Sequence, residues 1–290
     1  MEQSALITIF MPVALGTIML GLGLSLTTND FKRVLQYPKA MSIALTCQMV
    51  LLPALCLLLV ILFDLPPALG VGLMLLSASP GGATANLYSH LSNGDVALNI
   101  SLTAINSVLT LFTLPLIVNF SLGFLMNSDQ YVPMQFAKII EVFAIVLTPV
   151  LIGMLVRSKA PAFAAKMDKP VKITSALFLL LIIVSVTIRE RSMLVSSFNQ
   201  VGLPVLVFNV LSMALGYYVP LFFNVGKRQA IAIGLEIGLH NGTLAIYIAL
   251  NVLQNSTMSV PPAIYSLLMF FTAAAFGFLV NVGRGFKIST

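Results

Sequence analysis

The feature that most constrains the fold of this chain is a succession of apolar runs, each about as long as a membrane-spanning helix. Such a helix needs about 20 consecutive apolar residues. We predict nine spans, numbered one to nine, at residues 5–26, 40–63, 68–92, 96–120, 134–156, 171–188, 201–223, 229–253 and 260–282. The expected fold class is an all-α membrane protein.

Composition excludes a water-soluble globule. Of the 290 residues, 59% are hydrophobic and 8% are charged, whereas soluble domains are about 45–50% apolar and about 25% charged. The longest connecting stretches, around 121–133 and 157–170, are too short to bury a core, so residues 1–290 are expected to form a single transmembrane domain. The first apolar run follows residues 1–4, which lack a positive n-region, and it is too long for a signal peptide, so we expect it to remain as a span.

Lys and Arg are distributed unevenly between alternate connections. Positive residues are retained on the cytoplasmic side of a membrane. One set of connections carries twelve of the 15 basic residues: Lys32, Arg33, Lys39, Arg157, Lys159, Lys166, Lys169, Lys172, Lys227, Arg228, Arg284 and Lys287. The other set carries Arg189 and Arg191, with Lys138 just inside span five. This predicts a multi-pass protein of the inner (plasma) membrane with its N-terminus outside and its C-terminus in the cytoplasm.

Two spans carry helix-breaking and polar residues at their centres. Residues 77–86 of span three read Ser-Ala-Ser-Pro-Gly-Gly-Ala-Thr-Ala-Asn, and residues 234–243 of span eight read Gly-Leu-Glu-Ile-Gly-Leu-His-Asn-Gly-Thr. Pro removes a backbone donor and Gly favours unwinding. A helix broken at membrane depth must meet protein, water or a ligand, so both breaks indicate a site.

Spans three and eight run in opposite directions because they are five spans apart. Paired breaks in oppositely directed segments are typical of an inverted-repeat secondary transporter. Spans one to four would match spans six to nine. Span five would then have no partner, which suggests that an extra N-terminal helix has been lost.

Glu236 is the sharpest single clue to function. A carboxylate at the centre of a span costs about 2.5–3.5 kcal/mol on insertion scales, and span eight contains no Lys or Arg to pair with it. A bound cation would supply the missing charge. The alternative is a protonated Glu that makes hydrogen bonds inside the bundle. By contrast, Glu141 and Lys138, three residues apart near the outer end of span five, are expected to form a helix-surface ion pair.

Oxygen-bearing side chains that could complete a sodium shell occur in several spans. Asn86 follows the first break, Gln48 is an isolated amide in span two, and Asn99 and Thr103 share a helical face in span four. Hard cations favour oxygen ligands. Hydrogen bonds between helices are the simpler explanation for Asn99 or Thr103 taken alone, but their combination with Glu236 and two breaks favours a cation site.

His240 has three open interpretations: a ligand, a proton acceptor near neutral pH, or a hydrogen-bonded core histidine. An organic anion would be held by half-helix N-termini, by Asn and Thr donors and by bound cations. We expect Thr84, Asn86, His240 and Asn241 to contact it. Cys47 and Cys56 form neither a disulfide nor a transition-metal site, since they lie nine residues apart in one apolar run. Neither a hydrolase triad nor an organic cofactor is expected.

These residues resemble the bile acid:sodium symporter family, in the form of a bacterial member with nine spans. The residues from Ser79 to Asn86, followed by Asn93 to Leu98, look like the first broken-helix motif of that family, and Glu236 to Gly242 looks like the second. The resemblance covers nearly the whole chain. It implies a core domain that moves against a panel domain, with two sodium ions behind the crossing of the broken helices.

The resemblance also implies the ligands of the two ions. The first sodium site would use Asn86, Asn99, Thr103 and Glu236; the second would use Gln48, Glu236, His240 and the carbonyls of Ile237 and Leu239. Three positions depart from the family pattern: Ala85 stands where Ser or Thr is usual, Asn99 where Ser is typical and His240 where Gln is typical. Ala85 has no hydroxyl and His240 offers only nitrogen, which leaves coupling to one sodium ion, or with a proton, open.

The sequence therefore predicts a sodium-coupled symporter that imports an organic anion, bile-acid-like or a small carboxylate, by alternating access. Its partners are the substrate and the lipid bilayer, and neither a nucleic acid nor a protein partner is expected. One alternative is a proton-coupled or sodium-independent carrier of the same fold. A more distant alternative is an intramembrane enzyme that uses Glu236 and His240 as acid and base.

Overall fold

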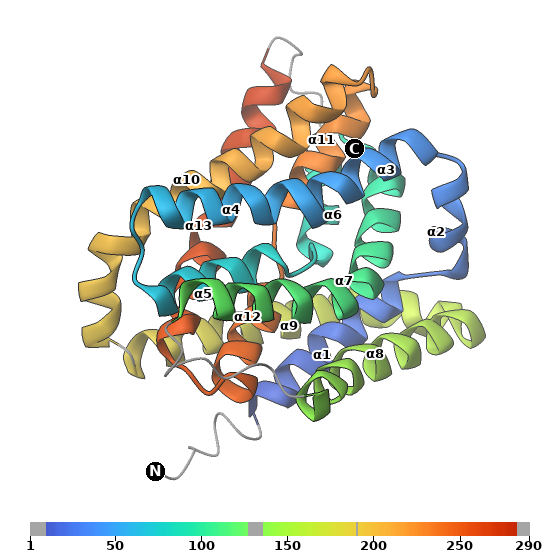
Figure 1. Ribbon diagram of the computed structural model, residues 1–290. Helices are drawn as coiled ribbons and strands as arrows, with labels where there is room; N and C mark the ends of the chain where they lie inside the picture. Colours follow the sequence, from blue (N-terminus) through green and yellow to red (C-terminus); the bar gives the residue numbers. More distant parts are fainter. Residues whose placement is uncertain (1–9, 127–135, 190, 283–290) are drawn as a thin grey trace.

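The computed structural model describes residues 10–126, 136–189 and 191–282, and these ranges are almost entirely helical (Figure 1). The predicted all-α fold is confirmed. The helices are α1 (Met11–Ser25), α2 (Thr28–Lys32), α3 (Pro38–Thr46), α4 (Leu52–Leu62), α5 (Pro67–Ser77), α6 (Ala83–Leu91), α7 (Val96–Leu125), α8 (Phe136–Lys159), α9 (Pro161–Arg189), α10 (Arg191–Phe222), α11 (Lys227–Gly238), α12 (Gly242–Tyr247) and α13 (Val260–Asn281).

Each of the nine predicted spans coincides with one helix or with two consecutive helices. Spans one, four, five, six, seven and nine correspond to α1, α7, α8, α9, α10 and α13, and span two to α3 and α4 joined by a π-helical turn. Spans three and eight are split, into α5 and α6 and into α11 and α12, with a π-helical turn at Ile248–Val252 extending α12. The parts of the predicted spans at residues 5–9 and 134–135 lie outside the described residues.

Length and apolarity alone qualify five of the described helical segments as membrane spans. They are Pro38–Leu62, Val96–Leu125, Ile140–Lys159, Phe198–Phe222 and Thr257–Asn281. A sixth is added if α1 and Thr28–Leu35, which meet at an angle of 73°, count as one span. The two halves of the split spans are each shorter than a bilayer is thick. Nine membrane crossings therefore stay a prediction.

The connections between spans five and six and between spans six and seven, at residues 157–170 and 189–200, are helical where the structure describes them. Only Ala160 separates α8 from α9, and α10 begins at Arg191. Pro161 occupies the first helical position, where its missing N–H costs nothing, and the following Ala residues favour helix. An apolar run predicts the part of a helix that lies within the bilayer. It does not predict where the helix begins and ends, because a helix can continue into polar residues. The other long connection begins with the end of α7 at Leu125, and its residues 127–133 are not described.

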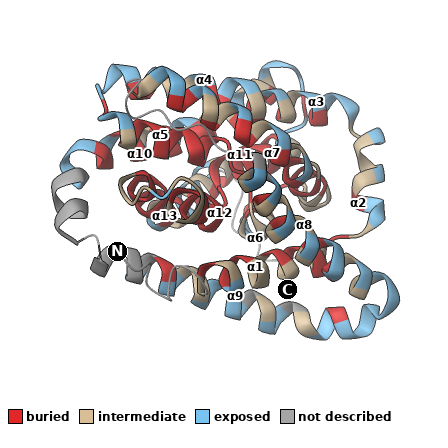
Figure 2. Cartoon of the chain, turned by 60° about the horizontal axis from the view of Figure 1, so that its bottom comes forward, coloured by how far each residue is buried: buried red, intermediate tan, exposed pale blue. Residues whose placement is uncertain are grey.

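Two groups of helices make up the molecule. α1 packs against α8 and α9, and Figure 2 shows α1 and α9 together along one side of the molecule. At Gly23 and Gly153 the backbones of α1 and α8 approach so closely that neither position has room for a Cβ. The split helices lie in the other group, in contact with α7, α10 and α13, and contain unbroken runs of buried residues, Leu69–Ser77 in α5, Ala230–Gly238 in α11 and Gly242–Tyr247 in α12 (Figure 2).

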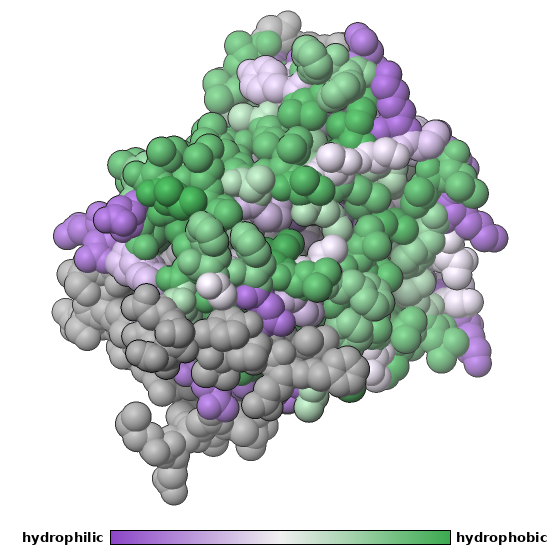
Figure 3. Space-filling view, viewed as in Figure 1, coloured by the Kyte–Doolittle hydropathy of each residue, from purple (hydrophilic) through white to green (hydrophobic). Residues whose placement is uncertain are grey.

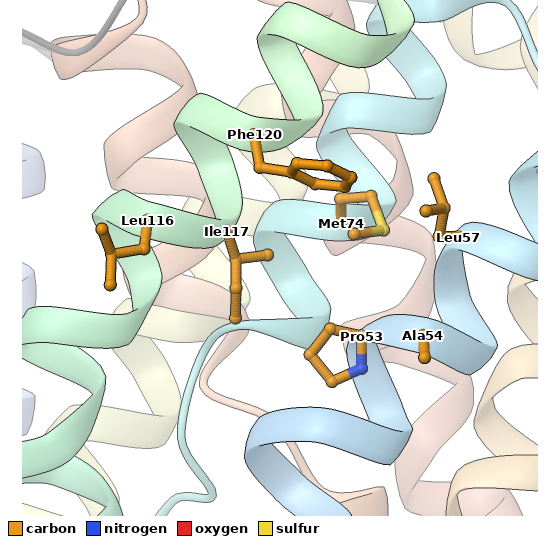
Figure 4. A pocket seen from close by; sticks show the side chains of 7 residues that line it. All are labelled: Pro53, Ala54, Leu57, Met74, Leu116, Ile117 and Phe120. Atoms are coloured by element: carbon orange, nitrogen blue, oxygen red, sulfur yellow. The ribbon is translucent and has the colours of Figure 1, made fainter.

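The visible surface is mainly apolar, with hydrophilic side chains gathered towards its edges (Figure 3). A cavity of about 350 Å³ opens on such apolar surface between α4, α5 and α7 (Figure 4). Its lining consists of Pro53, Ala54, Leu57, Met74, Leu116, Ile117 and Phe120, none of which carries a polar side chain. Leu116 and Phe120 are also exposed, at 70% and 54%. The cavity is therefore suited to hydrocarbon and lacks the polar groups of a transport site.

Candidate cation site at the crossing of two broken helices

The two broken helices meet at their breaks, deep inside the second group of helices. Gly81 and His240 form an isolated antiparallel bridge, and the N–H of Asn241 donates to the carbonyl of Pro80 at 2.8 Å. In a continuous helix the Asn241 N–H would bond to the carbonyl of Ile237. At the crossing, backbone groups freed by one break therefore bond to backbone groups of the other break. The carbonyl of Ile237 is left without the donor that it would have in a continuous helix.

Glu236 lies in the last turn of α11 beside this crossing and is fully buried. Its carboxylate accepts two hydrogen bonds from α7, one from the Thr103 hydroxyl at 2.7 Å and one from the Asn106 amide at 3.2 Å. Neither donor carries a charge. The structure thus brings the predicted pair Thr103 and Glu236 into direct contact and leaves the negative charge without a basic partner.

Asn99 lies on the same face of α7 as Thr103, one turn earlier. Its amide nitrogen donates to the backbone carbonyl of Ala232 at 2.7 Å, one turn before Glu236 on α11. Its side-chain oxygen is buried and has no hydrogen-bond donor. Asn99 is therefore held against α11 with a free oxygen near the carboxylate, as the sequence predicts for a ligand.

Several buried oxygens around the crossing share this lack of a donor. The side-chain oxygens of Gln48, Asn86, Asn99 and Asn106 have no hydrogen-bond partner. Buried polar atoms are normally paired, so each such atom calls for an explanation. Four amide oxygens and one carboxylate are a donor set that suits a hard monovalent cation.

Gln48 and His240 form a second cluster around the carbonyl of Ser79. The Gln48 amide donates to the carbonyls of Ser79 at 3.2 Å and Ser77 at 3.4 Å, and Nδ1 of His240 lies 3.0 Å from the Ser79 oxygen. The His240 ring stacks on Phe208, with a centroid distance of 6.1 Å. His240 is therefore a buried, hydrogen-bonded histidine, and its second nitrogen, Nε2, has no partner.

Gly81 lets the two breaks come together. A Cβ built at this position would overlap the carboxylate of Glu236. At the next residue, Gly82, the nearest atom to a Cβ would be Oγ1 of Thr84 at 3.7 Å, which is an ordinary van der Waals contact. The close approach of backbone to carboxylate therefore requires glycine at position 81 but not at position 82.

The remaining predicted residues surround the crossing. Ile237 and Leu239 are buried between Glu236 and His240. Asn241 caps α12, where its side-chain oxygen accepts from the N–H of Leu244 at 3.1 Å, and Thr84 lies half-buried in the first turn of α6. All the predicted site residues thus lie at or beside the crossing, while their roles as ligands stay a prediction.

Sequence reasoning missed two buried amides. Asn106 lies seven residues after Asn99 and three after Thr103, on the same helical face. This spacing alone would have placed Asn106 beside the two predicted ligands. Asn209 on α10 donates to the carbonyl of Gly238 at 3.0 Å, and its oxygen accepts from Thr272. Asn209 is an isolated amide in an apolar span, as Gln48 is.

The predicted ion pair between Lys138 and Glu141 is confirmed, with a distance of 2.7 Å and side chains 37% and 40% exposed. The other carboxylate oxygen of Glu141 accepts a hydrogen bond from the hydroxyl of Tyr247 on α12, at 3.2 Å. This bond joins α8, of the first group of helices, to the second broken helix.

Within the described part of the chain, no group of three or more His, Cys, Asp or Glu side chains is placed to hold a metal ion. Cys47 and Cys56 are both free and buried. The predicted ligands of the candidate site offer amide, hydroxyl, carboxylate and backbone carbonyl oxygens, and His240 adds a ring nitrogen.

Comparison with known proteins identifies the family. Residues 12–197 match the Sodium Bile acid symporter family. The probable sodium/metabolite cotransporter BASS2, chloroplastic, of Oryza sativa subsp. japonica is 28% identical over 87% of this chain and 59% of its own length. The sodium-dependent transporter YocS of Bacillus subtilis (strain 168) is 27% identical over 91% of this chain and 79% of its own length.

The P3 protein of Homo sapiens is 28% identical over 84% of this chain and 52% of its own length. The chain thus spans about three-fifths of the rice protein and about half of the human one. The family description and the names of the first two relatives are those of transporters, not of enzymes. With 186 of its residues matched, the chain belongs to the sodium bile acid symporter family.

Proposed function

We propose that this protein is a sodium-coupled symporter that imports an organic anion by alternating access. One observation carries the proposal: a fully buried carboxylate, Glu236, has only uncharged donors and lies among buried amide oxygens that have no donor. The names of two relatives, a sodium/metabolite cotransporter and a sodium-dependent transporter, agree with it.

The residues present suit sodium as a transported ion. Asn86, Asn99, Thr103 and Glu236 would form a first site on α6, α7 and α11. Gln48, His240 and the carbonyls of Ile237 and Leu239, together with Glu236, would form a second. The second set is weaker because Nδ1 of His240 is directed to the Ser79 carbonyl, so the proposal includes one or two ions per cycle.

An inverted repeat is supported by contacts that recur at one separation along the chain. Gln48 bonds to the carbonyl of Ser77, 29 residues later, where α5 ends. Asn209 bonds to the carbonyl of Gly238, also 29 residues later, where α11 ends. Gln48 and Asn209 are 161 residues apart, and so are Ser77 and Gly238.

The same separation of 161 residues relates groups that touch at the crossing. Ser79 and His240 are joined by a hydrogen bond, and Pro80 and Asn241 by another. Asn93 and Gln254, again 161 residues apart, both have positive φ, 58° and 50°. Equivalent residues that meet each other are what a local two-fold axis at the crossing produces, so the two halves are proposed to be inverted copies.

Nine spans and a cytoplasmic C-terminus are supported by where the basic connections lie. α2, which carries Lys32, and the junction of α8 with α9 lie at the same edge of the molecule, on the right of Figure 1. The short connection between α10 and α11, followed by Lys227 and Arg228, lies towards the same side (Figure 1). Positive residues on one face indicate the cytoplasmic side.

The substrate is proposed to bind where α6 and α12 begin. Backbone N–H groups at a helix N-terminus attract anions, and α6 begins after Gly82 with no side-chain cap. Thr84, Asn86, His240 and Asn241 lie beside these two starts. The substrate class is a bile-acid-like molecule or a small carboxylate.

Uptake into vesicles tests the proposal. The full chain would be reconstituted in potassium-loaded liposomes, and uptake of labelled bile acids and small carboxylates measured with sodium or potassium outside. The proposal expects accumulation of at least one anion that requires inward sodium. Uptake that follows a pH gradient and ignores sodium would contradict it and favour the proton-coupled carrier.

A further inference from the structure

We propose that Asn106 contributes its side-chain oxygen to the cation site, as a ligand in addition to the predicted residues. This inference rests on the proposed sodium coupling. Asn106 is 1% exposed, its amide nitrogen lies 3.2 Å from Oε1 of Glu236, and its oxygen has no hydrogen-bond partner. A buried amide that uses its nitrogen and leaves its oxygen unpaired is incomplete without a further partner.

The place of Asn106 on α7 supports this role. Asn99, Thr103 and Asn106 lie at positions i, i+4 and i+7 of one helix and so share one face. All three contact α11: Asn99 through the Ala232 carbonyl, and the other two through Glu236. Asn106 thus lies one turn beyond Thr103 on the face of α7 that carries the predicted ligands. It contacts the second oxygen of the same Glu236 carboxylate.

The contact with Glu236 allows Asn106 to take two roles in turn. In the structure the amide nitrogen of Asn106 donates a hydrogen bond to the Glu236 carboxylate. Rotation by half a turn about χ2 would exchange Nδ2 and Oδ1 and place the oxygen where the nitrogen now lies. This terminal torsion is broad and roughly two-fold. Asn106 can therefore stabilise the carboxylate when no cation shares it, and coordinate the cation when one does.

A neutral oxygen at this position also affects which ion fits. Cation selectivity depends on the number and the charge of the oxygen ligands. Asn106 adds an oxygen without a second negative charge, so the site keeps the single formal charge of Glu236. A set of one carboxylate and several neutral oxygens matches a monovalent ion.

The test measures sodium and lithium affinities of the purified full chain in detergent. Thermal unfolding is titrated with each ion against potassium at constant ionic strength, for wild type, Asn106→Leu and Asn281→Leu. Asn281 is a matched control, a buried amide that bonds to the Ser92 and Gly277 carbonyls on the last helix. Loss of a partner next to a metal ligand already lowers affinity about 10–100-fold.

We expect Asn106→Leu to weaken sodium binding at least about tenfold and to change the ratio of sodium to lithium affinity, while Asn281→Leu binds sodium as wild type does. An unchanged sodium affinity in Asn106→Leu overturns the inference. Equal weakening for both ions also overturns it, because a residue that only positions Glu236 would affect both alike.

Asn106→Asp keeps the test decisive if the leucine variant does not fold. It preserves the size and an oxygen but replaces the amide donor by a second carboxylate beside Glu236, which adds a negative ligand for the cation, so saturable stabilisation by sodium should persist. Loss of that stabilisation contradicts a ligand role. The wild type separates the two proposals: if it shows no sodium response, the proposed function fails, whereas a normal response in both wild type and Asn106→Leu removes only the inference.

Discussion

At the scale of single residues, the proposed cation binding depends on side chains at the crossing of the broken helices. Glu236 provides the only charge there among the residues that form the predicted site, and Thr103 and Asn106 hold its two oxygens from α7. The backbone at Gly81 lies against the same carboxylate. The site is therefore sensitive to the addition of a single methyl group.

Gly81→Ala is predicted to destabilise the crossing by about 1–3 kcal/mol, the usual cost of overpacking, and to weaken sodium binding, because its Cβ would displace the Glu236 carboxylate. Gly82→Ala is the matched control, since a Cβ there meets no close contact and its φ of −120° suits alanine. Thermal unfolding with and without sodium measures both effects. Equal behaviour of the two variants would refute this account of Gly81.

At the scale of elements, the first half of each broken helix ends at a backbone carbonyl that accepts a hydrogen bond from a side-chain amide of a neighbouring span. Gln48 satisfies carbonyls where α5 ends, and Asn209 satisfies the carbonyl where α11 ends. The two amides differ in their oxygens. The Gln48 oxygen has no partner, whereas the Asn209 oxygen accepts from Thr272.

This difference predicts different effects of two similar variants. Gln48→Leu and Asn209→Leu should each lower stability by about 0.5–1.5 kcal/mol, the net contribution of a hydrogen bond. The cost stays in this range because the Gly238 carbonyl still accepts from the hydroxyl of Tyr265, at 2.9 Å, and Nδ1 of His240 still lies 3.0 Å from the Ser79 carbonyl. Gln48→Leu should also weaken sodium binding about tenfold or more, whereas Asn209→Leu should not. Sodium titrations of thermal unfolding decide the matter, and equal sodium affinities in both variants would remove Gln48 from the site.

The sequence predicted the elements and the ion pair of Lys138 with Glu141, but not where the helices end or most of the contacts between them. Apolar runs located all nine helical ranges, and the Pro and Gly residues located both breaks, because these signals are local. The helical connection at residues 157–170 was missed because it is not apolar. Asn106 and Asn209 were missed because their importance comes from contacts 130 and 29 residues away along the chain.

At the scale of the whole molecule, the proposed alternating access would require the group formed by α1, α8 and α9 to move relative to the broken helices. The hydrogen bond from Tyr247 to Glu141 crosses between these groups at 3.2 Å. Tyr247 is 1% exposed, whereas Glu141 is bonded to a partly exposed Lys138 on its other oxygen. The Tyr247 bond would have to break whenever α12 moves along α8.

A double-mutant cycle of Tyr247→Phe and Glu141→Met is predicted to give a coupling of about 1 kcal/mol, as for a hydrogen bond at a partly buried site. The cycle of Lys138→Met and Glu141→Gln should give about 0.2–0.5 kcal/mol, since that pair is exposed. Thermal unfolding in detergent measures both. A Tyr247 coupling no larger than that of Lys138 would show that this bond does not hold the two groups together.

The most direct test of the central claim is whether Glu236 gives the protein a sodium-specific stability. Thermal unfolding of wild type, Glu236→Gln and Glu141→Gln would be titrated with sodium against potassium at constant ionic strength. At ten times the dissociation constant, sodium should stabilise wild type and Glu141→Gln by about 1.4 kcal/mol and leave Glu236→Gln unchanged. An equal response of wild type to both salts, or a sodium response that survives in Glu236→Gln, would contradict the account.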